Sequence, residues 1–177
     1  MLRILLRSAL LVAAAGLGLA ACENAPTYPI EPSIEVAGPI QRYRVSDDFG
    51  DRDSLVISLN WKDGDGDLGL SLDDTTGVYT ARGRNRFYYN YFIQPYLLDQ
   101  GRWTPINFGI SYNGRFPRMP LANPDQKETL RGVLNYSAVK FPVGYFPRNA
   151  QVRFEISIAD RALHESNTVT TDPVTLP

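Results

Sequence analysis

The sequence predicts an all-β chain that folds as an antiparallel β-sandwich, and three observations support this fold class. Apolar and polar side chains alternate at period two through residues 55–61 and again through residues 152–158, which is the pattern of strands with one buried face. No stretch of useful length repeats its apolar residues at the helical period. Thirteen prolines and 14 glycines are spread along the chain, and this frequency is typical of many turns.

Four further segments are predicted to be strands from their β-branched and aromatic content: residues 41–45, 87–98, 130–139 and 168–176. Asp99, Gln100 and Gly101 supply turn chemistry after the second of these, so residues 102–108 should return as the other half of a hairpin. Strands of this number, without an internal repeat, favour two packed antiparallel sheets of the immunoglobulin-like kind.

The first 21 residues have the organisation of a cleavable export signal. Arg3 and Arg7 give a positive start, residues 8–19 form a short apolar run, and Ala20 and Ala21 are small residues suited to cleavage. The apolar run is too short for a membrane-spanning helix, which needs about 20 residues. We therefore expect three parts: a signal peptide at 1–21, a tether at 22–39 and one β-sandwich domain at 40–177.

Residues 19–22, Leu-Ala-Ala-Cys, resemble the lipobox of bacterial lipoproteins. The resemblance implies that the thiol of Cys22 receives a lipid and that acyl chains such as palmitate anchor the new amino terminus. Cys22 is the only cysteine in the chain, whereas an exported domain ordinarily uses cysteines in disulfide pairs. We therefore expect the chain to be held to a membrane through Cys22 in the bacterial cell envelope, at the outer membrane.

The tether at 22–39 is predicted from its composition. It has few large apolar residues and contains four prolines: Pro26, Pro29, Pro32 and Pro39. Such a segment favours an extended chain that lifts the domain away from the membrane. The alternative is an irregular first strand, because Ile34 and Val36 alternate with polar residues, and each interpretation can hold for a different half of the segment.

The sharpest local motif is Asp63-Gly64-Asp65-Gly66-Asp67-Leu68-Gly69, directly after the first predicted strand. Three carboxylates at alternate positions in a glycine-rich loop can converge on one cation, because glycine permits the tight turns that bring them together. Ligands that are all oxygen favour Ca²⁺ over zinc or copper. We therefore predict a Ca²⁺ site at Asp63, Asp65 and Asp67. The alternative is a solvated turn, since Asp and Gly are ordinary turn residues.

Asp74 falls at the position that the last acidic ligand occupies in a helix-flanked calcium loop, so it is predicted to be a fourth ligand. Leu68 replaces the glycine that such a loop requires, and no flanking helices are predicted. The motif is therefore expected to be an acidic site between strand and loop, with Asp73 as a further candidate ligand.

A second motif, Asp160-Arg161-Ala162 followed by Ser166-Asn167, connects the last two predicted strands. Together with the lipobox and the acidic motif, it resembles a family of uncharacterised bacterial surface lipoproteins with β-sandwich folds. The resemblance implies export, anchoring and a β-rich domain, and no activity. It raises the hypothesis that Asp160 or Asn167 meets the acidic loop, as a metal ligand or a structural residue. The alternative, which we favour, is hydrogen bonding at strand ends.

The sequence favours a non-enzymatic binding or structural domain. His164 is the only histidine, and no serine motif accompanies it, so we expect an ordinary exposed loop residue. Cleavage of the signal leaves 16 basic residues against 19 acidic ones, which excludes a nucleic-acid partner. The ligand is expected to be an unknown protein or glycan. The alternative function is a glycan-binding or glycan-processing accessory with an aromatic groove, because the chain has ten tyrosines and eight phenylalanines.

Three arginines recur at spacing two: Arg82, Arg84 and Arg86. On a strand they would share one face, which predicts a charged edge strand facing solvent. The alternative is a surface that contacts lipid phosphates or acidic glycans.

The lipidation hypothesis predicts that Cys22→Ser abolishes acylation and releases the domain from membranes, because no other segment resembles an anchor. Metabolic labelling with a palmitate analogue, followed by fractionation of the cells, measures both effects. Label that persists on the Cys22→Ser protein contradicts the assignment.

Overall fold

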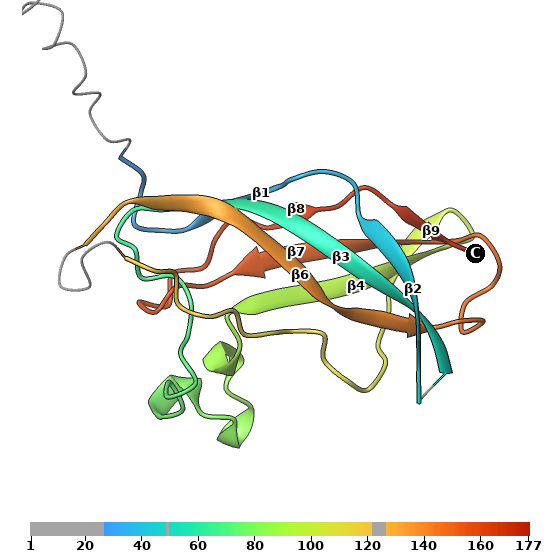
Figure 1. Ribbon diagram of the computed structural model, residues 1–177, viewed down its shortest axis with the longest axis horizontal. Helices are drawn as coiled ribbons and strands as arrows, with labels where there is room; N and C mark the ends of the chain where they lie inside the picture. The colour runs from blue at the N-terminus through green and yellow to red at the C-terminus, as the bar shows by residue number, and fades with distance from the viewer. Residues whose placement is uncertain (1–26, 49, 122–126) are drawn as a thin grey trace, which may run out of the picture.

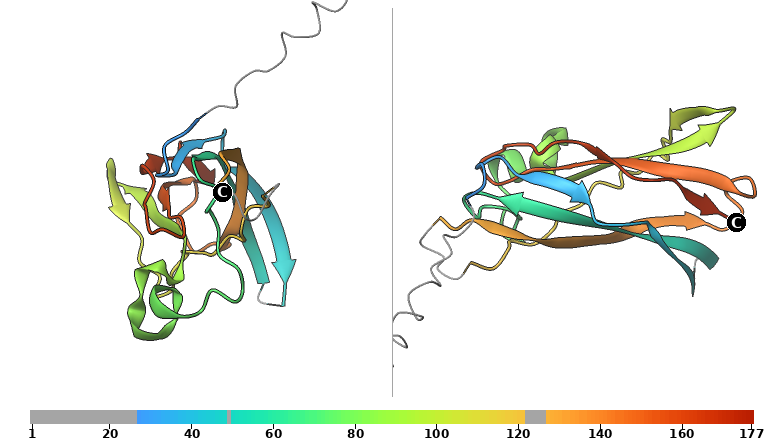
Figure 2. Two further views of the ribbon diagram at one scale, coloured as in Figure 1. Left: turned by 90° about the vertical axis from the view of Figure 1, so that its left-hand side faces the viewer. Right: turned by 90° about the horizontal axis from the view of Figure 1, so that it is seen from above.

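The chain folds as two antiparallel β-sheets packed face to face, which confirms the predicted all-β sandwich (Figures 1 and 2). The structure is a computed structural model and describes residues 27–48, 50–121 and 127–177. The sandwich is elongated. Residues 27–30 and the acidic loop, residues 63–69, lie at one end of its long axis, and the C-terminus lies at the other end (Figure 1). The immunoglobulin-like arrangement stays a prediction.

The first sheet, named here the β3 sheet, is built around its longest strand, β3 (Gly50–Asp63). Strand β6 (Leu130–Pro142) pairs with one edge of β3. The other edge is shared by two short strands, β2 (Gln41–Asp47) along the first half of β3 and β1 (Ser33–Val36) along the second half. Strand β3 is therefore covered on both edges along most of its length.

The second sheet, the β7 sheet, has the order β5, β4, β7 and β8, with β9 also paired to β7. Strand β4 (Tyr91–Asp99) and β5 (Arg102–Pro105) form the predicted hairpin. Strand β7 (Ala150–Ile158) lies beside β4, and its far edge is shared by β8 (Val169–Thr170) and β9 (Val174–Leu176). All of these pairings are antiparallel.

The core lies between the sheets and is built from the alternating residues that the sequence indicated. Inward positions on β3 and β7 are almost fully buried: Leu55, Ile57 and Leu59 on the first strand, and Val152, Phe154 and Ile156 on the second. Tyr91 and Tyr136 stack with ring centroids 4.0 Å apart, and this contact joins β4 to β6. The period-two prediction is therefore confirmed for both segments.

The sandwich begins before residue 40, where the tether was expected to end. Strand β1 pairs with β3, and Ile34 is 2 % exposed within the core. The backbone N–H and carbonyl of Ile34 are each 2.9 Å from side-chain atoms of Asn167, which lies beyond β7. The strand alternative for this half of the tether therefore describes the structure, because alternation at Ile34 and Val36 places apolar side chains over the core.

The segment before β4 is not the strand that the arginine spacing and the aromatic run at 87–90 indicated. It contains three 3₁₀ helices, η1 (Gly77–Tyr79), η2 (Arg82–Arg84) and η3 (Arg86–Tyr88). The guanidinium of Arg115 holds this segment, because it donates hydrogen bonds to the carbonyls of four of its residues: Ser71, Asp74, Tyr79 and Tyr88. A contact from another part of the chain thus overrides the local pattern.

The predicted export signal and Cys22 lie outside the described residues. Within residues 27–48, 50–121 and 127–177, no helix has the length and apolar character that crossing a membrane requires.

The contact of Asn167 with β1 predicts that Asn167→Ala destabilises the domain by about 1 to 2 kcal/mol, because two hydrogen bonds across the sheet edge are lost. Urea denaturation measures the change. Asn135→Ala is a matched control, since the Asn135 side chain makes an exposed bond to Ser58 and should contribute less than about 0.5 kcal/mol. Equal effects of the two substitutions would contradict a structural role for Asn167.

Candidate metal site

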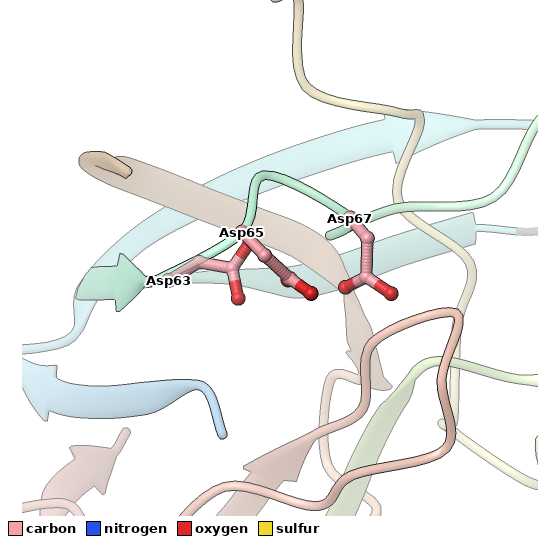
Figure 3. A group of neighbouring side chains, drawn as sticks. All are labelled: Asp63, Asp65 and Asp67. Carbon is pink, nitrogen blue, oxygen red and sulfur yellow. The ribbon is translucent and has the colours of Figure 1, made fainter. Parts of the chain in front are cut away.

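The acidic loop brings the carboxylates of Asp63, Asp65 and Asp67 together at the end of β3. One oxygen from each residue lies within 4.8 Å of the others, so the group can hold a metal ion. Figure 3 shows the three side chains on the same side of the loop, with Asp65 and Asp67 turned toward each other. Asp63 continues the inward-facing positions of β3 past Trp61, which is why a carboxylate reaches the edge of the core.

Four carboxylate oxygens in this group are buried and lack a hydrogen-bond partner among the described residues. They are both oxygens of Asp63, Oδ1 of Asp65 and Oδ1 of Asp67. Asp63 is 0 % exposed. The remaining two oxygens are engaged, because Oδ2 of Asp65 lies 2.8 Å from Nζ of Lys127 and Oδ2 of Asp67 accepts a 3.0 Å bond from the N–H of Ala162. Buried polar atoms are ordinarily paired, so these four unpaired oxygens are available as ligands for a cation.

Burial and mutual repulsion raise the pKa values of two of these carboxyls. Burial is the main cause that raises the pKa of Asp63 to about 6, and the charges of Asp67, Asp65 and Asp160 add to it, while the N–H of Gly66 opposes it. Burial, with Asp160 and Asp65, also raises the pKa of Asp67, against the opposing effect of Arg161. The loop therefore holds negative charge in a place where it is costly without a counter-ion.

The three glycines of the motif are required because other segments lie directly against them. A Cβ atom at Gly64 would overlap the carbonyl oxygens of Tyr28 and Pro29. One at Gly66 would lie 2.7 Å from the carbonyl oxygen of Glu128, and one at Gly69 would overlap the backbone at residues 117–118. Gly66 and Gly69 also have positive φ angles of 75° and 92°. The alternation of Asp and Gly thus places carboxylates on one side and close backbone contacts on the other.

The second sequence motif meets the first in space. Asp160 pairs with Leu68 in an isolated β-bridge, and the N–H of Arg161 donates to the carbonyl of Asp67 at 3.3 Å. The guanidinium of Arg161 also donates to the carbonyls of Leu68 and Gly69, each at 3.2 Å. The loop that follows β7 therefore fixes the shape of the acidic loop and brings one positive charge close to it.

Asp160 lies beside the three carboxylates but outside the group that can share one ion. It is 2 % exposed, and its two oxygens contact the backbone N–H and the ring Nδ1 of His164, both at 2.8 Å. The hydrogen bond and the charge of Asp160 raise the pKa of His164. His164 is thus the hydrogen-bond partner of a buried acid, whereas an ordinary exposed loop residue is what the sequence predicts.

The structure places Asp74, Asp73 and Asn167 away from the group. The carboxylate of Asp74 contacts the guanidinium of Arg118 at 2.7 Å and accepts a 2.6 Å bond from the N–H of Ser71. The bond from Arg118 is the main cause that lowers the pKa of Asp74 to about 2. Asp73 is exposed, and Asn167 bonds to β1 as described above. Asp74 is therefore a partner of an arginine, in place of the fourth ligand that the motif spacing suggested.

Three residues near the acidic loop had no assigned role in the sequence: Lys127, Arg161 and His164. Arg161 belongs to the second motif and His164 lies beside it. The hypothesis that the two motifs meet in space therefore points to both residues as neighbours of the acidic loop. Lys127 is 62 positions from its partner Asp65 and carries no local signal.

Two adjoining hollows of about 270 and 330 Å³ lie along β4 and share Ile93, Gln94 and Asn113. Arginines cover aromatic side chains at the outward positions of the β7 sheet. The guanidinium of Arg86 lies 4.0 Å from the Phe92 ring centroid, and that of Arg153 lies 4.5 Å from Trp103 and 5.7 Å from Tyr96. Two other aromatic side chains differ in their exposure: Phe116 is buried, whereas Tyr145 is 58 % exposed. The acidic loop lines neither hollow.

No family model, no curated protein and no solved structure matches this chain.

The raised pKa of Asp63 predicts that the domain without a bound cation loses stability as the pH rises. The folded state holds the proton of Asp63 more tightly than the unfolded chain does. This contribution is fully present below pH 3.8, the ordinary pKa of an aspartate side chain, and is lost as the pH rises through about 6. As the pH rises across this range, the free energy of unfolding of the wild-type domain should fall by about 3 kcal/mol relative to that of Asp63→Asn.

Chemical denaturation in a chelator at several pH values between about 4 and 7 measures this loss of stability. Asp73→Asn is the control, because Asp73 is exposed on the same loop, and it should keep the wild-type pH dependence. If the free energies of unfolding of the wild type and of Asp63→Asn change in parallel with pH, Asp63 is not a buried carboxyl with a raised pKa.

Proposed function

We propose that this chain is a lipid-anchored bacterial envelope lipoprotein whose non-enzymatic β-sandwich binds Ca²⁺ and serves as a binding or structural module. The observation that supports the cation most directly is Asp63, which is fully buried with two unpaired oxygens beside Asp65 and Asp67. A carboxylate in this environment is stable only when it is protonated or paired with a cation.

Calcium is the ion that the donor set fits best. The four unpaired atoms are all carboxylate oxygens, and hard cations prefer such ligands, whereas zinc and copper prefer nitrogen or sulfur. The ligands come from alternate positions of a single loop, and Ca²⁺ accepts irregular geometry more readily than Mg²⁺ does. The ring of His164, the only histidine, is engaged with Asp160 at 2.8 Å.

A structural role for the ion is favoured over a catalytic one. Hydrolysis by two carboxyl groups requires an acid and a base separated across a cleft that admits a substrate. One oxygen of each of the three acids here lies within 4.8 Å of the others, and Asp63 is the buried last residue of a core strand. An ion at this position would hold the end of β3 and the acidic loop in one conformation, and the loop that follows β7 packs on the same acidic loop through Arg161.

The anchoring part of the proposal rests on the signal organisation of residues 1–21 and on Cys22. Only six positions separate Cys22 from Tyr28, where the described chain contacts the acidic loop. An extended chain spans at most about 3.6 Å per residue, so lipid on Cys22 would hold this end of the sandwich within about 22 Å of the membrane surface.

A glycan-binding accessory is the second candidate function, and the hollow lined by Gln94, Asn113, Glu155 and Ser157 favours it, because amide, carboxylate and hydroxyl groups suit a ligand rich in hydroxyls. The arginines that cover Phe92 and Trp103 leave less ring surface for stacking on sugars.

Calcium should raise the melting temperature of the domain. With a Kd of roughly 10⁻⁴ to 10⁻³ M, millimolar Ca²⁺ should add about 1 kcal/mol, which corresponds to a shift of about 2–4 °C for a domain of this size. Asp65→Asn should abolish most of the shift, because it removes one ligand charge while it keeps the size of the side chain. Melting curves in calcium and in chelator measure both effects.

Asp73→Asn is again the matched control for the calcium response, since it removes an acidic charge from the exposed part of the same loop. It should keep the wild-type shift. If the wild-type domain melts at one temperature in calcium and in chelator, and calorimetry detects no binding, the loop is only a turn and the calcium assignment is wrong.

A further inference from the structure

The chain that leads into β1 lies directly against the back of the acidic loop. The carbonyl oxygens of Tyr28 and Pro29 occupy the space that a Cβ atom at Gly64 would fill. Gly64 stands between Asp63 and Asp65, two of the three residues that can share an ion. Residues 63–65 thus have the candidate cation site on the side of their carboxylates and the chain at residues 28–29 on the opposite side.

A second contact fixes the same segment. The ammonium group of Lys62 lies 5.8 Å from the centroid of the Tyr28 ring, at the last position of β3 before Asp63. Beyond Pro32, which is buried, Ile34 is held in the core and bonded to Asn167. Residues 28–31 are therefore the part of the incoming chain whose position depends on the acidic loop, while residues 33–36 are fixed by the sheet.

The conformation of the acidic loop depends on its charge balance. Asp63, Asp65 and Asp67 repel one another when all are ionised, and relaxation of that repulsion requires the loop to widen. The carbonyl oxygens of Tyr28 and Pro29 lie where a Cβ atom at Gly64 would be, so movement of the Gly64 backbone toward them displaces residues 28 and 29. Loop opening and release of residues 28–31 are thus coupled by contact.

We propose that a divalent cation bound by Asp63, Asp65 and Asp67 docks residues 28–31 onto the sandwich through Gly64, so that calcium controls where the incoming chain is fixed to the domain. This inference rests on the proposed cation site. Without calcium the incoming chain is fixed to the sandwich from Pro32 onward, and with calcium it is fixed from Tyr28 onward. The first residue that the sandwich holds after the proposed anchor at Cys22 therefore changes with the calcium concentration.

Limited proteolysis of the full chain, isolated from expressing cells, tests this coupling. Proteinase K is added in calcium chloride or in chelator, and mass spectrometry locates the cleaved bonds. Cleavage within residues 27–32 should be slower in calcium by about fivefold or more, the lower end of ordinary coupling between two sites. The exposed turn at residues 99–101 lies in the β4–β5 hairpin and is the internal control, since its cleavage rate should not change.

Pro29→Gly separates the coupling from the cation site itself, because it changes no residue of the acidic loop. Glycine gives the incoming chain more backbone freedom and so weakens the docking of residues 28–31 against Gly64. Pro29→Gly should bind calcium in a titration but show reduced calcium-dependent protection of residues 27–32. Tyr28→Ala is the second variant, because it removes the ring that the ammonium group of Lys62 contacts, and it should reduce the protection in the same way.

The outcomes distinguish this inference from the proposed function. Calcium binding with protection of residues 27–32 in the wild type, and with reduced protection in the variants, supports the coupling. Calcium binding with unchanged cleavage of residues 27–32 in the wild type overturns the coupling and leaves the cation site in place. Absence of calcium binding to the wild type overturns both.

Discussion

The burial of an ionisable carboxylate at the end of the central strand is the constraint on which this end of the molecule depends. Strand β3 places Leu55, Ile57, Leu59 and Trp61 in the core, and the next inward position is Asp63. A negative charge there needs compensation within a few ångströms. After the hydrogen bond to Asp65, the charge of Asp63 contributes to raising the pKa of Lys127. Arg161 acts on the neighbouring Asp67. Neither Lys127 nor Arg161 is bonded to Asp63, whose oxygens have no hydrogen-bond partner among the described residues.

The sequence predicts those parts of the fold and the site that depend on local periodicity. Alternation identified β3 and β7, and the turn residues at 99–101 identified the hairpin of β4 and β5. The spacing of Asp63, Asp65 and Asp67 likewise predicted their convergence, because alternate positions in a glycine-rich loop share one side. In each case the information lies within a few consecutive residues.

The features that the sequence did not predict depend on contacts between distant residues. Arg115 orders the segment before β4 into 3₁₀ helices, and it lies 27 positions from Tyr88 and 44 from Ser71. Arg118 takes Asp74 away from the acidic group at a separation of 44 positions. The spacing of Asp74 within the motif was correct for a ligand, but local spacing does not reveal which distant guanidinium competes for the carboxylate.

The interleaving of aspartate and glycine in residues 63–69 has a consequence for how this segment can change over time. At the aspartate positions a substitution alters the charge around a buried ion site, while at Gly64, Gly66 and Gly69 any side chain meets the backbone of another segment. Insertion or deletion of one residue would exchange the two kinds of position and create both faults together. The seven residues can therefore be conserved or lost only together, because a single substitution at an aspartate or glycine position damages either the ion site or the packing of the loop.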